Sequence, residues 1–382
     1  MEQVFENIGR FLSCGRKGTL VTITHTRGST YRRAGAKMLC AQDSELIGSI
    51  SGGCLEADVL ERSLGVLEEG GPQLVKYETN AESDNVWDLG LGCNGSLEVL
   101  IESLKDWANP EGLQIFESAC EHVRNRQSFA LVSTLTRNDQ PIRRVFRMLI
   151  DAGGGSSGSL GDTQLDLEAR GQALLLLRGR PNRTSRKVMV RSGRDRWELF
   201  IDVLAPPTTL LVMGGGHDAI PLVRLASEMG FAVVLIDSRP QFATQERFPW
   251  ASEVVCARPE EISTKVPFEG SPAVVVMNHH YGRDCATLGQ VLSSPEHFLY
   301  VGALGPRART EKMLDDLRAQ GFLLKDDKLD ALHAPIGLDL GSDNPDEIAL
   351  GIVAEILAVK NDRPGGPLRN RKGPIHQVAA GP

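Results

Sequence analysis

The chain has 382 residues, which is long for a single hydrophobic core, so its length predicts two domains. Hydrophobic residues make up 41% of the sequence and charged residues 24%, the balance typical of a soluble globular protein. The formal net charge of −7 repels phosphate backbones and argues against nucleic-acid binding.

The sequence also lacks the signals of export. No apolar run approaches the ~20 residues that a membrane span requires. Acidic residues stand where a signal peptide would carry basic ones, so we expect a cytoplasmic protein with no membrane partner. The 7 cysteines contain no CxxC pair and are expected to be free thiols, and no metal-ligand set is predicted.

Apolar and β-branched runs in the first half predict strands with helices between them. The predicted strands cover residues 19–24, 36–41, 97–101, 130–135 and 200–204, and the predicted helices cover 55–67 and 113–124. Glycines and serines dominate residues 152–162, which predicts an exposed flexible loop. We therefore expect an α/β domain with a mixed sheet over residues 1–205.

Two prolines, Pro206 and Pro207, cannot continue a sheet and mark the predicted domain boundary. Beyond them strands alternate with helices, which predicts a Rossmann-like, doubly wound parallel sheet over residues 206–361. The strands are expected at 210–213, 232–236, 253–255, 273–277 and 298–301, and the helices at 219–229, 285–292, 309–320 and 345–359. Residues 362–382 are predicted to form a disordered tail.

The first strand of this second domain runs into a G-x-G-x-x-A dinucleotide fingerprint. Gly214 permits the tight turn, Gly216 lets a phosphate approach the backbone, and His217 lies in the same turn. Asp237 ends the next strand, where an acidic group can bind a ribose hydroxyl. The motif predicts the fold, but whether the site binds NAD(P), a pterin or nothing stays open.

Two later strand ends carry further candidates, since the carboxyl ends of parallel strands face the ligand crevice. His279 is a candidate acid/base, weighed against an ordinary loop histidine. Gly302, Gly305 and Arg307 form a second candidate, in which glycines allow close approach and the arginine holds phosphate or carboxylate. A plain surface turn is the alternative for this second group.

In the first half, Gly52, Gly53 and Cys54 form a Gly/Ser loop that opens a helix. The helix N-terminus favours anions and thiolates. Glu56 can cap this turn or accept a proton. Cys93 lies in another glycine-rich loop, and a thiolate there would suit a thiophilic metal centre or carry sulfur as a persulfide. Whether the two cysteines share one site stays open.

The polar loop over residues 27–35 is a third candidate. Arg27, Ser29, Arg32 and Arg33 supply cationic and hydroxyl groups that can grip a phosphate. Three polar, glycine-containing loops in one small domain favour a binding site over a purely structural role.

Taken together, the long motifs resemble the XdhC/CoxF (CoxI) family of maturation factors for xanthine and carbon monoxide dehydrogenases. The resembling segments are residues 28–38, 48–56, 89–95, 214–219, 237–242, 247–249, 300–305 and 333–339. Small departures exist: Tyr31 stands where proline is common, and residues 278–280 read Asn-His-His in place of Thr-His-Asp.

The resemblance implies an accessory factor that binds molybdenum cofactor, supports its sulfuration with a cysteine desulfurase and inserts it into a molybdenum hydroxylase such as xanthine dehydrogenase. It also implies a homodimer. The chain lacks the cysteine set of iron–sulfur domains, so it is not expected to be the dehydrogenase itself. Two alternatives remain: an NAD(P)-dependent oxidoreductase that uses His279 and Asp237, and a non-catalytic nucleotide sensor.

Overall fold

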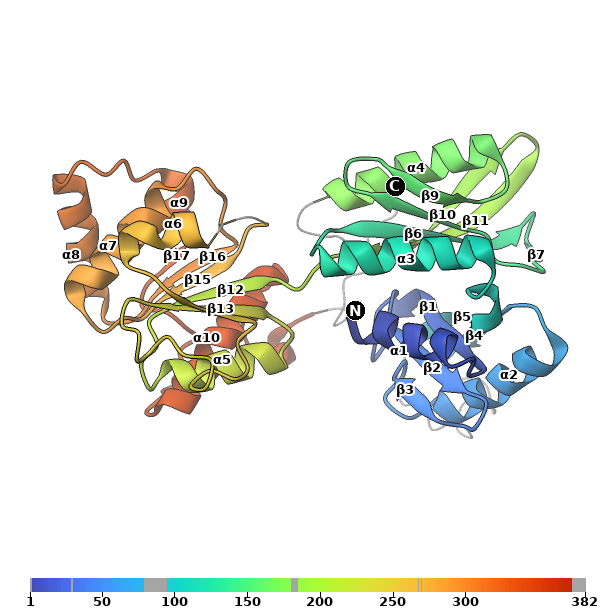
Figure 1. Ribbon diagram of the computed structural model, residues 1–382, viewed down its shortest axis with the longest axis horizontal. Helices are drawn as coiled ribbons and strands as arrows, with labels where there is room; N and C mark the ends of the chain where they lie inside the picture. The colour runs from blue at the N-terminus through green and yellow to red at the C-terminus, as the bar shows by residue number, and fades with distance from the viewer. Residues whose placement is uncertain are drawn as a thin grey trace. The chain divides into compact units, whose positions relative to one another are not determined.

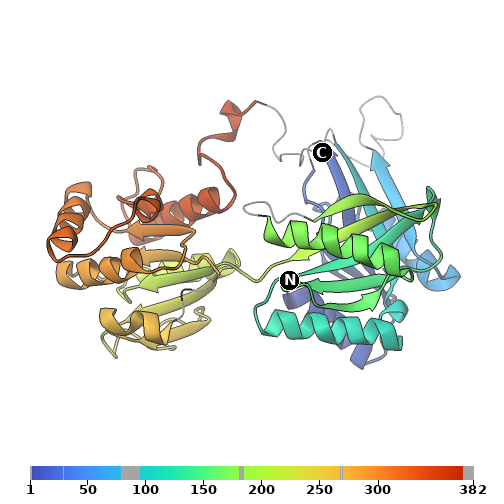
Figure 2. The same cartoon turned by 90° about the horizontal axis from the view of Figure 1, so that it is seen from above.

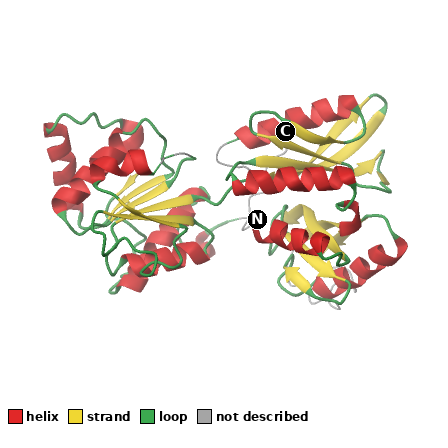
Figure 3. Cartoon of the chain, viewed as in Figure 1, coloured by secondary structure: helices red, strands yellow, loops and turns green. Residues whose placement is uncertain are grey.

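The computed structural model describes residues 2–28, 30–78, 95–179, 185–266, 268 and 270–372. The chain divides into two compact units. The N-terminal unit comprises Met1–Pro206 with Leu368–Pro382, and the C-terminal unit comprises Pro207–Pro367 (Figure 1). Helices and strands occur in both, which confirms the α/β class (Figure 3).

The described strands of the N-terminal unit form two antiparallel sheets. Their bounds are β1 Gly18–Gly28, β2 Lys37–Ala41, β3 Leu46–Gly48, β4 Gln73–Glu78, β5 Gly95–Ser103, β6 Phe129–Arg137, β7 Gln140–Pro141, β8 Arg147–Asp151, β9 Ser156–Ser159, β10 Arg186–Ser192 and β11 Asp195–Leu204. The sheet orders are β3-β2-β1-β5-β4 and β10-β11-β6-β8-β9, with β7 beside β6. Every described pairing in this unit is antiparallel, whereas the sequence predicts a mixed sheet. Short turns join β2 to β3 and β10 to β11, and such turns can join only antiparallel neighbours. The pairings of β1 with β5 and of β6 with β11 join strands that are far apart in the sequence.

Helices fill the space around these sheets (Figure 2). Their bounds are α1 Glu2–Ser13, α2 Glu56–Glu69, α3 Pro110–Arg124 and α4 Thr163–Arg178. One core joins α1 and α3 to both sheets and includes Phe5, Trp107 and Phe129. Helix α2 packs on the first sheet through Val59, and α4 packs on the second through Ala169. Each sheet therefore has one face toward the shared core and one toward its own helix.

The prediction of an exposed flexible loop over residues 152–162 is wrong for Ser156–Ser159, which form β9, although most residues of the segment are exposed. In β9, Ser157 pairs with Leu149 of β8. Asp162 then caps α4 by accepting a hydrogen bond from the Leu165 N–H at 2.7 Å. Gly158 has φ +83, and an added Cβ would lie 2.6 Å from the Arg147 carbonyl oxygen, so this glycine serves a crowded strand and not a linker.

The described strands of the C-terminal unit form one parallel sheet in the order β14-β13-β12-β15-β16-β17. The strands are β12 Thr209–Met213, β13 Ala232–Asp237, β14 Glu253–Cys256, β15 Ala273–Val276, β16 Tyr300–Ala303 and β17 Leu332–His333. The helices are α5 Ala219–Glu228, α6 Ile262–Lys265, α7 Tyr281–Ser293, α8 Arg307–Ala319, α9 Asp326–Asp330 and α10 Pro345–Lys360. This order is that of the Rossmann fold, which confirms the prediction.

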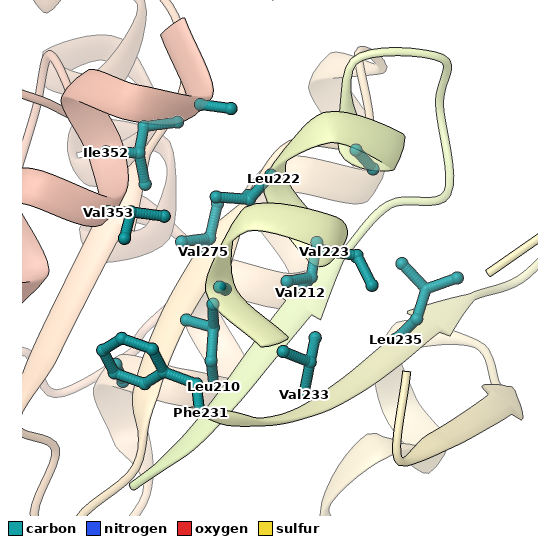
Figure 4. Close-up of a cluster of buried hydrophobic side chains, with 14 of the residues drawn as sticks. Leu210, Val212, Leu222, Val223, Phe231, Val233, Leu235, Val275, Ile352 and Val353 are labelled. Carbon is teal, nitrogen blue, oxygen red and sulfur yellow. The ribbon is translucent and has the colours of Figure 1, made fainter. Parts of the chain in front are cut away.

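Helices cover both faces of this parallel sheet. Helices α5 and α10 pack on one face, where Leu222 and Ile352 meet strand residues such as Val212 and Val275 (Figure 4). Helices α6, α7 and α8 pack on the other face. Burial on both sides explains why these strands are continuous apolar runs in the sequence.

The last helix of this unit begins with a polar cap, and the residues from Leu368 onward are grouped with the N-terminal unit. Asn344 caps α10 by accepting a hydrogen bond from the Glu347 N–H at 3.0 Å. The Glu347 carboxylate accepts in turn from the Asp343 N–H at 2.8 Å. Residues 362–372 of the predicted disordered tail are described and include the short 3₁₀ turn Leu368–Asn370, whereas residues 373–382 lie outside the described part. None of the described helices is long and apolar enough to cross a membrane.

Candidate functional site

The Gly/Ser loop before α2 is closed around the carboxylate of Glu56. The N–H groups of Ser51 and Gly53 donate to it at 3.0 and 2.9 Å, and the Ser49 hydroxyl donates at 2.9 Å. Further donors are the Ser51 hydroxyl and the N–H groups of Ile50 and Leu55. Burial alone would raise the Glu56 pKa, but these hydrogen bonds outweigh it and lower the pKa to about 2. Glu56 is therefore an anion that organises the loop and not a proton acceptor near neutral pH.

Two of the predicted loops meet in this unit. An added Cβ on Gly52 would lie 3.1 Å from the ring of Tyr31, so the loop over residues 27–35 lies against the loop that precedes α2. Cys54 is a free, exposed thiol on the same loop. Arg27, Arg32 and Arg33 are also exposed. The structure thus places a thiol and cationic side chains on adjacent loops, whereas Ser29 and Cys93 lie outside the described residues.

A buried polar pair lies next to the end of the 27–35 loop. Lys37 pairs with Asp202, and their side chains are 8% and 6% exposed. The Ser185 hydroxyl donates to the same carboxylate at 2.6 Å. Gly35 packs here, because an added Cβ would lie 2.9 Å from the Asp202 carboxylate. These contacts anchor the polar loop of the first sheet to strand β11 of the second.

A second polar group joins the two sheets of this unit. Lys187 contacts the carboxylates of Glu98 at 2.8 Å and Glu198 at 2.7 Å. Burial alone would lower the Lys187 pKa, but the hydrogen bonds that Lys187 donates to Glu198 and Glu98 raise it. Neither polar group is predicted from the sequence, because their members are far apart in the chain and follow no spacing rule.

In the C-terminal unit the glycine turn after β12 is held tightly. Gly214 has φ +125, and an added Cβ would lie 2.4 Å from the Met277 carbonyl oxygen. At Gly216 an added Cβ would lie 2.5 Å from the Asp218 carboxylate. His217 is exposed in the same turn. The packing of the turn therefore requires glycine at position 214, whether or not a ligand binds there.

A carboxylate and an imidazole meet where the strand order reverses, between β12 and β15. Asp218 Oδ2 lies 2.5 Å from His279 Nε2. The Asp218 side chain is 16% exposed, the His279 side chain is 57% exposed, and His279 has φ +55. The neighbouring His280 caps α7, because its Nδ1 accepts from the Arg283 N–H at 3.3 Å. Of the two adjacent histidines, His279 is thus the one that contacts an aspartate.

Asp237, the predicted ribose-binding residue, is engaged by the protein. It accepts from the Gly215 N–H at 2.7 Å and from the Arg239 N–H at 2.8 Å. Arg239 also donates through Nε at 2.9 Å and Nη2 at 2.7 Å. Burial alone would raise the Asp237 pKa, but the Arg239 hydrogen bonds outweigh it and lower the pKa. The carboxylate therefore ties the glycine turn to the end of β13.

Packing accounts for one residue of the third predicted group. Gly302 lies within β16, where an added Cβ would collide with Ile336 at 2.2 Å. Gly305 has φ +122 and lies under Arg309. Arg307 is exposed and lies 3.9 Å from Glu311 on its own helix. These residues share the carboxyl edge of the sheet. The contact with Ile336 is enough to explain why position 302 is glycine, without a ligand.

The motifs around Tyr300 and His333 also have a structural reason. Glu355 of α10 accepts from the Tyr300 hydroxyl and from the Gly337 N–H at 2.8 Å, and His333 Nδ1 lies 3.1 Å from it. The Tyr300 and His333 rings stack with centroids 4.3 Å apart. This group fastens the segment after β17 to α10. No group of three His, Cys, Asp or Glu side chains suited to a metal ion occurs within the described ranges.

Comparison with known proteins identifies relatives along most of the chain. A protein of Bacillus subtilis (strain 168), named as a probable subunit of xanthine dehydrogenase, is 28% identical over 345 residues, which cover 90% of this chain and 93% of that protein. The molybdenum cofactor insertion chaperone PaoD of Escherichia coli (strain K12) is 22% identical over 351 residues, covering 91% of this chain and 85% of that protein.

A solved structure supports the same grouping. The crystal structure of a protein titled a xanthine dehydrogenase from Bacillus halodurans is similar with a TM-score of 0.73 and 26% identity, covering 96% of each chain. A sequence model described as the XdhC Rossmann domain matches residues 210–356, and one described as the XdhC and CoxI family matches residues 12–78. The chain therefore belongs to the XdhC and CoxI family.

Proposed function

We propose that this chain is an accessory factor that binds molybdenum cofactor, supports its sulfuration and inserts it into a molybdenum hydroxylase such as xanthine dehydrogenase. The observation that carries the proposal is the match to a relative named a molybdenum cofactor insertion chaperone, which spans 91% of this chain. In this role the cofactor is cargo that the chain binds and then transfers to the hydroxylase. The proposed partners of the chain are a cysteine desulfurase and a second copy of the chain itself.

The loops of the N-terminal unit suit such cargo. Glu56 satisfies the N–H groups of its own loop, which leaves the Cys54 thiol as the exposed soft ligand. The adjacent loop carries Arg27 and Arg32, whose guanidinium groups suit the phosphate of a pterin cofactor. We therefore place the cargo site on these loops, with Cys54 as the residue that contacts it.

Loading of the purified full chain tests this proposal. Molybdenum cofactor released from a molybdoenzyme is added, unbound cofactor is removed by gel filtration, and retained molybdenum and pterin are measured. We expect retention by the native chain and by Cys14→Ser, which changes another exposed cysteine of the same unit. Cys54→Ser should lose most of it. A native chain that retains no cofactor would refute the proposal.

An oxidoreductase is the second candidate, and the Asp218–His279 pair is the observation that favours it. An aspartate-oriented imidazole at the crevice of a Rossmann sheet could exchange the proton that accompanies hydride transfer. This candidate requires that the chain reduce or oxidise a nicotinamide cofactor with turnover and that His279→Ala abolish it. The accessory role requires no turnover of this kind.

A further inference from the structure

Helix α4 carries an apolar stripe on the side that faces away from its sheet. Its buried residues, such as Ala169 and Ala173, pack on the second sheet of the N-terminal unit. On the opposite side, Leu167 and Leu175 are 63% and 65% exposed. Single exposed leucines are common on protein surfaces, but these two lie about two turns apart on one line along the helix. Such a line is the pattern of a helix face that packs on another element.

Gly171 lies midway along the same line, one turn from each leucine. It is exposed, and an added Cβ would meet nothing within 4 Å. A glycine inside a helix is less stable than an alanine would be, and no close contact explains this one. Its bare backbone would let a second helix approach closely at this point. The stripe therefore reads leucine, open glycine, leucine, an order that is the same in both directions.

Two charged side chains flank the stripe and differ in sign. Glu168 lies toward the start of α4 and Arg178 lies at its end, and both are exposed. Neither has an ion-pair partner among the described residues. A parallel copy of α4 would place like charges opposite each other, whereas an antiparallel copy places Arg178 near Glu168. The charges thus complement a second α4 in the antiparallel direction.

We infer that this face of α4 joins two copies of the chain, with the two helices antiparallel and crossing at Gly171. Leu167 of one copy then packs on Leu175 of the other, and the two-fold symmetry forms this contact twice. Arg178 of each copy reaches the turn that carries Glu168 of the other. The inference rests on the second copy named under the proposed function, and it adds the surface through which that copy binds.

Sedimentation velocity of the full chain over a range of concentrations tests the inference. We expect the native chain to sediment as a dimer. The double variant Leu167→Asp with Leu175→Asp should weaken the dimer about 100-fold or more, because it places carboxylates against apolar side chains. Leu323→Asp is the matched control and should leave the dimer unchanged, since Leu323 is 76% exposed in the C-terminal unit.

Cross-linking tests the register independently of these variants. Because the two-fold axis places position 171 of one copy against position 171 of the other, mild oxidation of Gly171→Cys should give a covalent dimer. Leu167→Cys alone should not, because its two copies would lie about 12 Å apart along the helices. A mixture of Leu167→Cys and Leu175→Cys chains should cross-link. The native chain, oxidised in parallel, gives the background from its own cysteines.

Three results would overturn the inference: a native chain that is monomeric at every concentration, a dimer that the two aspartates do not weaken, or a Gly171→Cys dimer that does not cross-link. In a monomeric chain, slow alkylation of Gly171→Cys would mean that another part of the chain covers α4, and fast alkylation would mean that the face is open. A monomer would also remove the second copy from the proposed partners, whereas an unweakened dimer would refute the surface alone. Retention of molybdenum cofactor by the same preparations tests the maturation role separately.

Discussion

The glycine loops of the two units each enclose a carboxylate of the protein, but they hold it differently. Glu56 is held by hydroxyl and backbone N–H groups of its own loop. Asp237 is held by an arginine and by an N–H group of a turn 22 residues away. The first loop is closed on itself and exposes a thiol, whereas the second is tied to the end of β13 through Asp237 and Arg239. A glycine-rich sequence therefore does not tell whether its N–H groups are free for a ligand.

Glycine substitutions give the largest contrast between the two loops. Gly214→Ala should destabilise the Rossmann unit by about 3–5 kcal/mol, because the new Cβ would lie 2.4 Å from Met277 O in a left-handed backbone. Gly53 has a similar φ of +119, but an added Cβ there would meet nothing within 4 Å. Gly53→Ala is therefore expected to destabilise its unit by only about 1–2 kcal/mol. Hydrogen exchange resolved by unit measures both, and equal losses would contradict the packing argument.

Removal of the Asp237 charge should have the next largest effect. Asp237→Asn leaves the Arg239 guanidinium without its carboxylate in a mostly buried site, which predicts a loss of about 2–4 kcal/mol. Asp346→Asn is the matched control, since Asp346 is 71% exposed and pairs with Arg224. Its loss should stay below about 1 kcal/mol. Thermal unfolding of both variants checks the difference.

Lowering the pH should reduce the stability of the N-terminal unit through protonation of Glu56. Its pKa is about 2 in the fold against an ordinary value of 4.5, so its contribution is present above pH 4.5 and is lost as pH falls toward 2. After allowance for solvent screening, the contribution is about 1–2 kcal/mol. In Glu56→Gln, the loss of unfolding free energy as pH falls from 4.5 toward 2 should therefore be smaller by that amount. An unchanged acid limb would show that the loop hydrogen bonds are not formed.

The cysteines should show the smallest effect on stability and a clear effect on reactivity. Cys54→Ser should change stability by less than about 0.5 kcal/mol, since the thiol is exposed. Alkylation of the native chain should modify Cys54 far faster than Cys40, because Cys40 is buried and burial raises its pKa. Mass spectrometry of peptides after brief alkylation measures both rates. Comparable rates would mean that the loop does not present Cys54 as described.

The Rossmann unit was largely predictable because its signals are local. Continuous apolar strands, the fingerprint at Gly214 and the cap at Asn344 all appear within short windows of sequence. The N-terminal unit was less predictable. Strand β9 has a glycine and serine composition that is typical of a linker, and only its pairing with β8 makes it a strand.

The candidate sites also combine features that local sequence predicts with pairings that only the structure reveals. Gly214, Asp237 and His279 share one edge because the carboxyl ends of parallel strands do. The pairing of His279 with Asp218 needed the structure, since 61 residues separate them. Lys37 and Asp202 are 165 residues apart and are joined only by the packing of two sheets. No spacing in the sequence marks such a pair.

The cofactor content of the client enzyme tests the central claim most directly. The gene for this chain is deleted, and the molybdenum hydroxylase is purified and assayed separately for molybdenum cofactor and for the sulfido ligand. We predict normal amounts of hydroxylase protein with a deficit of one or both, restored by the native chain and not by Cys54→Ser. A hydroxylase with full cofactor and sulfido content in the deletion strain would contradict the account.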